Sequence, residues 1–445
     1  MTARSFSNKE SYIWKKQGIY LIRKFPKSRG KEADMEKTEG MEEKNRSFGR
    51  GVLYGAVGAL VVVALLYMAA SPFIFTAWRK GGLSAGEANQ IVKKLDSITR
   101  ELDDLYLEEL DRETMLEDAY SSYVASLGDR YTCYYTREEY ALFQESTSGI
   151  YSGVGITVTM DQETGYLKVV EIQAGSPAEG TQIRPGDLLL KVDGTDLQGM
   201  KQEQMVSMIK GEEGTKAVLE FRHGVSGSVY TEELTRKKME TETVRSTLLE
   251  DGIGYLALEG FEEVTTHQFE EALQSLEEQQ IRGLVIDLRN NPGGRLDVVT
   301  DILDTLLPEG IITYTEDKWG NREDFTSDAD CLELPLAVVI NGNSASASEI
   351  FAGAVKDFGT GTLIGTKTYG KGIVQRTLGL GDGTALKVTM ARYYTPKGSY
   401  IHGVGIEPDI AVDLPEGTTY SKNLSYEEDI QLQTAVEAVK TKLGK

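Results

Sequence analysis

The stretch GLVIDLRNNPGG, residues 283–294, decides the fold of the larger part of this chain. Its first six residues are almost all apolar, which is typical of a strand buried on both faces of a sheet. A second run of this kind, LAVVIN, occupies residues 336–341. Periodic apolar residues predict helices before, between and after these strands, over 266–279, 296–307 and 348–358. Buried strands that alternate with helices predict an α/β domain.

A different pattern precedes this domain. Short apolar segments alternate with glycine turns, and one short helix is predicted over 202–209. Several strands with a single small helix suit a compact α+β module. We therefore assign residues 147–237 to such a module and residues 238–420 to the α/β domain. The strands predicted in the module are 166–172, 188–192 and 217–221.

The segment before the module, residues 84–146, is predicted to be helical. Ile91, Leu95 and Ile98 recur at spacings of three and four residues with acidic residues between them. Further along, Thr136 and Glu139 have the spacing of a capping box, which predicts the start of another helix. At the other end of the chain, residues 421–445 are predicted to form an amphipathic helix.

The N-terminal part carries a membrane signal. No charged residue occurs from Gly51 to Trp78, and a helix needs about 20 such residues to cross a bilayer. We therefore predict one transmembrane helix over 51–76. Residues 1–50 hold thirteen Lys/Arg against seven Asp/Glu, so this segment is expected to stay in the cytoplasm and the rest of the chain to be extracytoplasmic. A signal peptide cleaved near Ala69-Ala70-Ser71 is the alternative, but the long apolar stretch favours an uncleaved anchor.

Composition excludes two classes of function. The net charge of −21 argues against nucleic acid as a partner, because phosphates require a basic face. The two cysteines, Cys133 and Cys331, lie in different predicted units and form no CxxC or Cys/His cluster. We therefore expect two free thiols and no metal site.

The first chemical motif is NGNSASASE, residues 341–349, between the strand 336–341 and the helix 348–358. Small residues at a strand-to-helix turn let a hydroxyl stand at a helix N-terminus, where backbone N–H groups favour developing negative charge. Helix capping explains one serine. Three alternating serines exceed what a cap needs, but the residues alone do not choose among them.

A nucleophilic serine needs a base. The chain has three histidines, His223, His267 and His402, and none lies in a run of small or buried residues, so we expect them at the surface. Lys371 lies in TKTYGKGIVQ, residues 366–375, a stretch without acidic residues. A lysine acts as a base only when burial and the absence of nearby acids favour its neutral form. A solvated loop lysine is the structural alternative for Lys371.

The buried strand 283–288 runs directly into RNNPGG, residues 289–294. A Gly-Gly turn at the end of a strand can present backbone N–H groups toward a cleft, as an oxyanion hole requires. A simple turn that ends a strand explains the same residues.

Together these motifs resemble those of the carboxyl-terminal processing peptidases, or tail-specific proteases, of peptidase family S41. The likeness covers about residues 85–440 and includes DLRNNPGG, SASASE, TYGKGIVQ, YYTPKG and GVGIEPD in the expected order. The family implies a ClpP/crotonase-like α/β serine peptidase domain with an inserted PDZ domain. That PDZ domain corresponds to the module at 147–237.

The resemblance also assigns residues. It implies that Ser346 is the nucleophile, Lys371 the general base and Gln375 the residue that orients the lysine amine. The oxyanion hole would use the N–H of Ala347 and one from Gly293 or Gly294.

The PDZ-like module supplies a candidate tail-binding loop. By resemblance, the segment Gly153, Val154, Gly155 and Ile156 would bind the terminal carboxylate of a peptide that adds as a β-strand. Two departures from the family pattern are Tyr369, where Phe is common, and Arg130, where Pro is frequent.

The function implied is a membrane-anchored, extracytoplasmic serine endopeptidase that cleaves proteins recognised by their C-terminal tails. No cofactor is expected. Expected partners are tailed protein substrates and the membrane, together with a second copy of the chain and a regulator acting on the PDZ gate. Two other readings are a PDZ adaptor with a degenerate protease domain and a membrane-bound esterase or amidase.

Overall fold

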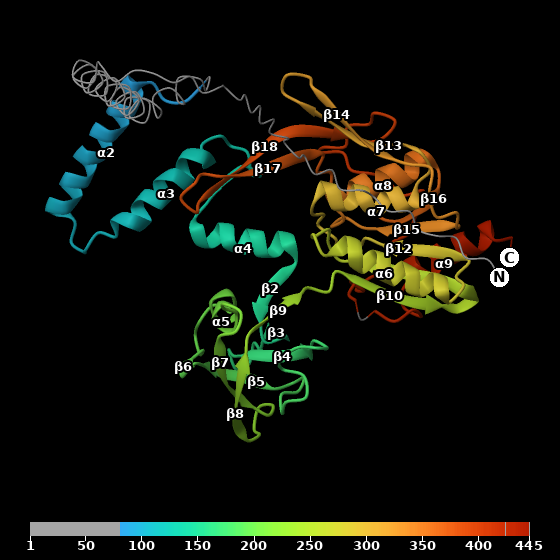
Figure 1. The fold of residues 1–445 in the computed structure, drawn as a ribbon, viewed down its shortest axis with the longest axis horizontal. Coiled ribbons are helices and arrows are strands. Elements are labelled where there is room, and N and C mark those ends of the chain that lie inside the picture. Colours follow the sequence, from blue (N-terminus) through green and yellow to red (C-terminus); the bar gives the residue numbers. More distant parts are fainter. Residues whose placement is uncertain (1–80, 423, 445) are drawn as a thin grey trace, which may run out of the picture. The chain divides into compact units, whose positions relative to one another are not determined.

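The computed structural model describes residues 81–422 and 424–444, which belong to two compact units, residues 1–110 and 111–445 (Figure 1). In the first unit, α2 (Ala85–Leu105) confirms the predicted helix. Its N-terminus is fixed by a capping box, in which the backbone N–H of Ser84 donates to Glu87 Oε2 at 2.8 Å. No residue of α2 is buried.

The predicted basic segment 1–50 and transmembrane helix 51–76 lie outside the described residues. In the part of the chain that the structure describes, no helix combines the length and the apolar character needed to cross a membrane.

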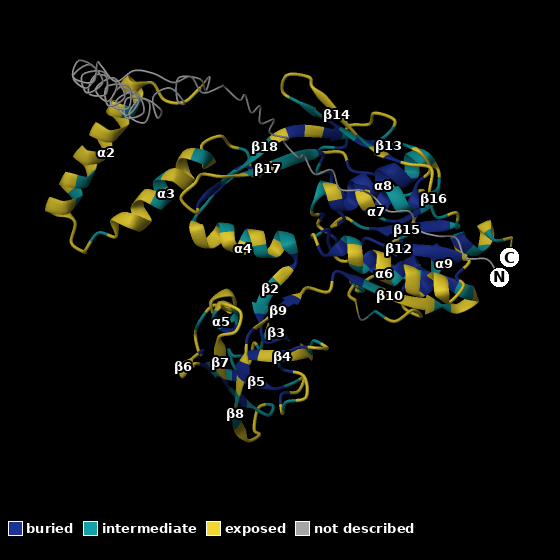
Figure 2. Ribbon diagram, in the orientation of Figure 1, coloured by how far each residue is buried: buried dark blue, intermediate teal, exposed yellow. Residues whose placement is uncertain are grey.

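The central sheet of the second unit confirms the α/β prediction. Neighbouring strands from β11 to β19 are parallel, and β10 joins the edge in the antiparallel sense. Every residue of β12 and β15 is buried, as Figure 2 shows (dark blue). The strand order is β10 (Val244–Leu249), β11 (Ile253–Leu258), β12 (Gly283–Asp287), β15 (Leu336–Ile340), β16 (Gly361–Gly365) and β19 (Ile410–Ala411).

Helices cover both faces of this sheet, which explains why its central strands β12 and β15 are almost wholly apolar. Successive side chains of a strand point to opposite faces. Accordingly, Leu284 and Ile286 pack in one core with residues of α6 (Thr265–Glu278), α7 (Leu296–Leu306) and α8 (Ala347–Phe358). Val285 packs in another core with α9 (Ile430–Lys442), the predicted C-terminal helix.

A second sheet flanks the first and corrects the prediction for residues 84–146. That region does contain α3 (Arg112–Ala125) and α4 (Arg137–Ser148), and the capping box of Thr136 and Glu139 is confirmed. The helical reading was wrong for β1 (Cys133–Tyr135), because this short strand forms only by pairing with a distant strand, β18 (Ala385–Tyr394). The remaining strands of the sheet are β13 (Gly310–Asp317), β14 (Arg322–Ser327) and β17 (Ile373–Gly379).

The α+β module has its own apolar core and confirms the predicted strands and helix. A ribbon of β2 (Ile150–Gly153) and β9 (Lys237–Glu240) stands where the chain enters and leaves it. Its helix is α5 (Gln202–Ile209), and β3 (Ile156–Met160) ends its sheet. The other strands are β4 (Leu167–Ile172), β5 (Leu188–Val192), β6 (Thr195–Asp196), β7 (Lys216–Arg222) and β8 (Val229–Thr235).

Candidate active site

The loops that follow β12 and β15 meet because the two strands are parallel neighbours. Their carboxyl ends therefore lie at the same edge of the sheet. The backbone N–H of Asn290 donates to Asn341 Oδ1 at 3.0 Å, and that of Ala345 donates to the carbonyl of Asn291 at 3.1 Å. The predicted oxyanion loop and the predicted serine loop are thus joined directly.

The structure separates the three serines that composition could not. Ser344 is buried, and its hydroxyl donates to the carbonyl of Leu288 at 2.8 Å. Ser348 is also buried, and its hydroxyl donates to the carbonyl of Asn291 at 2.9 Å. These two serines tie the loops together. Ser346 instead lines a cavity of about 1010 Å³, which Lys371 also lines.

The backbone of Ser346 is strained. It has φ 56° and ψ −113° at the N-cap of α8, a conformation that non-glycine residues rarely adopt. Such strain persists only where the surroundings enforce it and is concentrated at functional sites. One enforcing contact is a hydrogen bond from the Ser346 N–H to Glu349 Oε2 at 2.9 Å.

Glu349 is fully buried and joins the serine loop to the lysine loop. Besides the Ser346 N–H, its carboxylate accepts the N–H groups of Gly370 and Lys371, both at 2.7 Å, and the hydroxyl of Thr368 at 2.6 Å. Sequence reasoning quoted Glu349 only as the end of the serine motif. Its position three residues after the N-cap was the available signal, since a capping box places a glutamate there.

Tyr393 forms a second bridge between the same two loops. It is buried, and its hydroxyl lies 3.0 Å from the carbonyl oxygen of Ser346 and also hydrogen-bonds the carbonyl of Lys371. Burial raises the pKa of the Tyr393 phenol well above its usual range, so it remains a neutral donor. This role of Tyr393 could not be predicted from local sequence, because the two carbonyls that it contacts belong to other segments of the chain.

Lys371 is half-buried at the cavity. Burial is the main cause that lowers the pKa of its amine, and the positive charges of Lys387 and Arg130 add to this effect. The negative charge of Glu349 opposes it. The lysine stretch itself has no acids, as expected, but α8 supplies one from a distant part of the chain. The net shift still favours a neutral amine, which a general base requires.

Gln375 lines the same cavity but makes other contacts. Its amide Nε2 lies 3.4 Å from the carbonyl of Ile373 and 3.4 Å from Thr389 Oγ1. The structure records no hydrogen bond from this amide to the Lys371 amine among the described residues. The orienting role of Gln375 therefore stays a prediction.

The glycine pair of the predicted oxyanion loop packs closely, with Gly293 against Ser346. A Cβ on Gly293, whose φ is 103°, would lie 2.8 Å from Ser346 Cβ and 2.9 Å from the backbone N of Ala347. A Cβ on Gly294 would lie 2.3 Å from the carbonyl oxygen of Phe261. Only glycine fits at either position. The Gly293 N–H donates to Asn291 Oδ1 at 2.8 Å, so the geometry favours Gly294 over Gly293 as a partner of Ala347 in the oxyanion hole.

A buried ion cluster anchors the start of this loop. Arg289 contacts Asp287 Oδ2 at 2.6 Å and Asp429 Oδ2 at 2.7 Å, and its guanidinium stacks on the ring of Tyr420 at 3.9 Å. The C-terminal segment therefore supports the oxyanion loop, a link that the sequence did not reveal.

The three histidines lie outside the lining of the cavity that contains Ser346 and Lys371. His223 Nδ1 pairs with Asp187 Oδ1 at 2.9 Å inside the α+β module, and His267 pairs with Glu240 at 2.8 Å. His402 Nδ1 accepts the backbone N–H of Gly372 at 3.3 Å. None of them is among the residues that line the cavity of Ser346. The arrangement offers Ser346 a lysine rather than a histidine.

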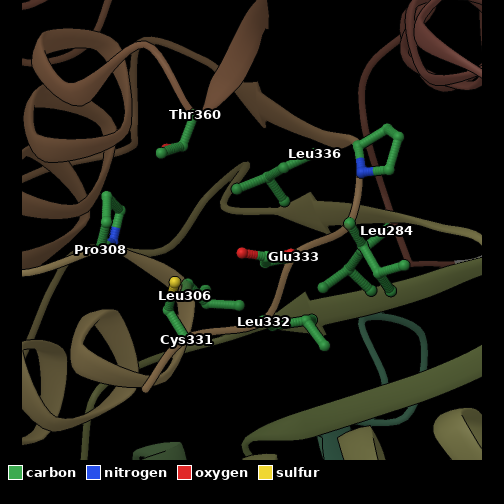
Figure 3. Close-up of a pocket in the computed structure, with 10 residues that line it drawn as sticks. Leu284, Leu306, Pro308, Cys331, Leu332, Glu333, Leu336 and Thr360 are labelled. Atoms are coloured by element: carbon green, nitrogen blue, oxygen red, sulfur yellow. The ribbon is translucent and has the colours of Figure 1, made fainter. Parts of the chain in front are cut away.

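The described part of the chain contains a second pocket but no cluster that could hold a metal ion. Its His, Cys, Asp and Glu side chains form no group of three or more that could hold a metal ion, and Cys133 and Cys331 are free thiols. Figure 3 shows a second pocket, of about 330 Å³, lined by Leu284, Leu336 and Cys331 among others. Because Leu284 is the second residue of β12 and Leu336 the first of β15, this pocket lies at the opposite end of the strands from the serine loop.

The predicted tail-binding residues lie where β2 passes into β3. The Val154 carbonyl accepts the N–H of Ala178 at 3.0 Å, and the Gly155 carbonyl accepts that of Gln173 at 3.0 Å. Gly155 has φ 77°, and a Cβ there would lie 2.1 Å from Ser176 Cβ, so this turn requires glycine. Gly153 ends β2 and Ile156 begins the edge strand β3.

Comparison with known proteins decides the family. The sequence model of peptidase family S41 matches residues 252–412, and that of the PDZ domain matches residues 144–220. A carboxyl-terminal-processing protease of Synechocystis sp. is 36% identical over 319 residues, which are 71% of this chain and 74% of that protein. The chain belongs to the carboxyl-terminal-processing proteases of peptidase family S41.

Other relatives agree with this family. A CtpA-like serine protease of Staphylococcus aureus is 30% identical over 81% of this chain and 72% of its own length. The solved photosystem II D1 C-terminal processing protease is 31% identical over 72% of this chain and 88% of its own, with a TM-score of 0.43. The two family models and the sequence relatives show that the chain is an S41 serine-type peptidase that carries a PDZ domain.

Proposed function

We propose that this S41 peptidase is an endopeptidase that cuts proteins recognised by their C-terminal tails, with Ser346 and Lys371 as its catalytic dyad. One observation carries the proposal. Ser346 and Lys371 line one cavity, and a single buried carboxylate, that of Glu349, accepts hydrogen bonds from the backbone N–H groups of both. The carboxylate of Glu349 thus holds the backbones of Ser346 and Lys371 in place.

The proposed reaction is acyl transfer. The neutral amine of Lys371 takes the hydroxyl proton of Ser346, and the serine oxygen attacks the scissile carbonyl carbon. Backbone N–H groups of Ala347 and Gly294 stabilise the oxyanion, in keeping with their places on the cavity wall. The ammonium of Lys371 then protonates the leaving amine. Water, deprotonated by Lys371, hydrolyses the acyl-enzyme and regenerates the serine hydroxyl.

Tail recognition is assigned to the PDZ domain. Its strand β3 ends the sheet in the part of the chain that the structure describes, so its outer edge can accept an extended peptide as a further strand. The loop Gly153–Ile156 precedes and opens this strand, which suits it to bind the terminal carboxylate through backbone N–H groups.

A matched pair of substrates tests this assignment. We expect the enzyme to cleave a loosely folded protein with an apolar C-terminal tail, and amidation of that C-terminus to raise KM by about 10- to 100-fold. The reason is that hydrogen bonds to a charged group contribute about 1.5–3 kcal/mol each, and the amide lacks the charge. The measurement is steady-state cleavage of the two forms by the full-length chain.

The Ser346→Ala variant controls for contaminating proteases, and an ester substrate without a tail controls for general esterase activity. Equal KM values for the acid and the amide would refute recognition of the terminal carboxylate. Hydrolysis of the ester with no cleavage of the tailed protein would favour the esterase reading.

We also propose that the peptidase domain is extracytoplasmic, anchored by residues 51–76 with residues 1–50 in the cytoplasm. The uncharged stretch and the basic segment before it support this arrangement. In cells that express the full chain, externally added protease should digest the peptidase domain of intact protoplasts. Protection of that domain until the membrane is dissolved would refute this topology.

A homodimer and a regulator of the PDZ domain complete the proposed partners. The apolar side chains of α2 that are exposed in its unit support a second copy as a partner, since exposed apolar stripes are costly in water. These side chains include Ile91, Val92, Leu95 and Ile98.

A further inference from the structure

A short segment outside both matched family ranges, residues 129–132, lies against the lysine loop. It is fixed locally, because Asp129 accepts the Thr132 hydroxyl at 2.6 Å and the Tyr131 N–H at 3.0 Å. It is also fixed to the second sheet, since the N–H of Thr389 in β18 donates to Thr132 Oγ1 at 3.0 Å. The segment thus has a defined position relative to β18.

Tyr131 uses this position to cover Lys371. The Lys371 amine lies 4.9 Å from the centre of the Tyr131 ring, so the ring occupies space beside the amine that water would otherwise fill. The ring face also attracts the ammonium, and this weak attraction opposes part of the effect of burial. On another side the ring of Tyr131 meets that of His402, edge to face, with centres 6.5 Å apart. Tyr131 is therefore packed between two parts of the catalytic domain that are far apart in sequence.

Arg130 fastens the same segment to the loop that carries Lys371. Its Nη1 donates to the hydroxyl of Tyr369 at 3.0 Å, and its guanidinium lies 5.1 Å from the centre of the Tyr131 ring. Tyr369 precedes Lys371 by two residues. The contact joins two residues that lie 239 positions apart in the chain.

We propose that residues 129–132 form a cover for the general base, in which Tyr131 shields the Lys371 amine from water and the Arg130–Tyr369 hydrogen bond holds the cover closed. The inference rests on the proposed function, since it takes Lys371 as the base. Tyr131, Arg130 and Tyr369 act through Lys371 and are positioning residues. A cover that keeps water from the amine acts in the same direction as burial, the leading cause of the lowered pKa of Lys371.

Several charged or titratable groups face Lys371, and they set what the cover can add. Lys387 of β18 and Arg130 of the cover favour the neutral amine, whereas Glu349 of α8 favours the charged one. Three phenols and one imidazole lie nearby. Tyr131 contacts the amine itself, Tyr369 accepts from Arg130, Tyr393 hydrogen-bonds the backbone carbonyl of Lys371, and His402 accepts the backbone N–H of Gly372. If the cover opens, water solvates the ammonium, and the negative charge of Glu349 continues to favour this charged form. The pKa of Lys371 therefore rises.

The pH dependence of kcat/KM tests the cover. For Tyr131→Ala, we expect the acidic limb of the profile of the full-length enzyme to move about one pH unit upward, with about a tenfold loss of kcat/KM at a fixed pH below the limb. Tyr131→Phe is the matched control, because it keeps the ring and should leave the limb in place. A loss of activity without a shift would indicate a merely structural role and would overturn the proposal.

The Arg130–Tyr369 hydrogen bond, here called the latch of the cover, is tested separately with Arg130→Gln and Tyr369→Phe. Each single variant should move the limb in the same direction as Tyr131→Ala but by less, because the ring of Tyr131 remains. If the two residues act through one contact, the shift in the double variant should be smaller than the sum of the single shifts. Strictly additive shifts would refute the latch.

A readout independent of catalysis separates this inference from the proposed function. Trace acetylation with acetic anhydride labels only neutral amines, so labelling of the Lys371 peptide against pH, followed by mass spectrometry, gives its titration. We would measure it in the Ser346→Ala background, which also prevents self-cleavage. A higher titration midpoint in Tyr131→Ala than in Tyr131→Phe supports the cover even if Lys371 proves not to be the base. Equal midpoints would overturn it.

Discussion

Replacing Ser346 or Lys371 with alanine is expected to lower kcat by about 10⁴- to 10⁶-fold. Ser346→Ala removes the atom that forms the acyl-enzyme, and Lys371→Ala removes the base that makes this atom nucleophilic. Because both residues act in one step, the double variant should be no slower than the worse single variant by more than a small factor. The measurement is single-turnover cleavage of a tailed protein by the full-length chain.

The chain offers a matched control for the lysine. Lys367 lies four residues before Lys371 and forms an exposed ion pair with Glu407 at 2.8 Å, so Lys367→Ala should keep nearly full activity. Activity of Lys371→Ala close to that of Lys367→Ala would refute the dyad. Loss of activity in Lys371→Ala together with a normal unfolding curve would support it.

The same dyad predicts the sign of the pH dependence. The base acts when it has lost its proton, so kcat/KM should rise as pH rises through the pKa of Lys371. Burial lowers this pKa from its ordinary value of 10.5, and the acidic limb should therefore fall below that value. A rate that falls with rising pH over this range would contradict a lysine base.

Glu349→Gln is expected to lower kcat by about 10²-fold or more and to destabilise the folded chain by about 1–3 kcal/mol. The glutamine amide keeps the size of Glu349 but presents N–H donors on one side. The carboxylate accepts four donors, those of Ser346, Gly370, Lys371 and Thr368, and a glutamine cannot satisfy all of them. The nucleophile and base loops would then lose part of their common support.

Steady-state kinetics and urea unfolding measure the two effects. Glu407→Gln is the control, because Glu407 is exposed and its ion pair with Lys367 contributes little to stability. A Glu349→Gln enzyme with normal stability and normal kcat would show that the shared carboxylate does not organise the site. Normal kcat with reduced stability would restrict Glu349 to a structural role.

Local patterns predicted the elements that carry these residues. The continuous apolar runs at 283–288 and 336–341 became buried strands, and the periodic segments before and between them became helices close to their expected bounds. These patterns are reliable because burial on both faces of a sheet demands apolar side chains at every position. The same reasoning missed β1, because a three-residue strand has no period of its own and depends on its pairing with β18.

The candidate site was only partly visible in the sequence. Order and spacing of the motifs indicated Ser346 and Lys371 by resemblance, but the residues alone left three serines open. Packing separated them, because the hydroxyls of Ser344 and Ser348 are taken by carbonyls of the neighbouring loop. No local pattern could show this, since those carbonyls lie more than fifty positions away in the chain.

The sequence by itself determined the alternation of strands and helices in the α/β domain, the PDZ-like module and the family, because the patterns that show them lie in residues that are close together in the chain. Only the tertiary structure decided what surrounds those side chains. Glu349 and Tyr393 join the serine and lysine loops, and Tyr131 covers the amine. These contacts arise where parallel strands bring their carboxyl ends together and where β1 pairs with β18, so they depend on the topology of the sheets and not on the spacing of residues.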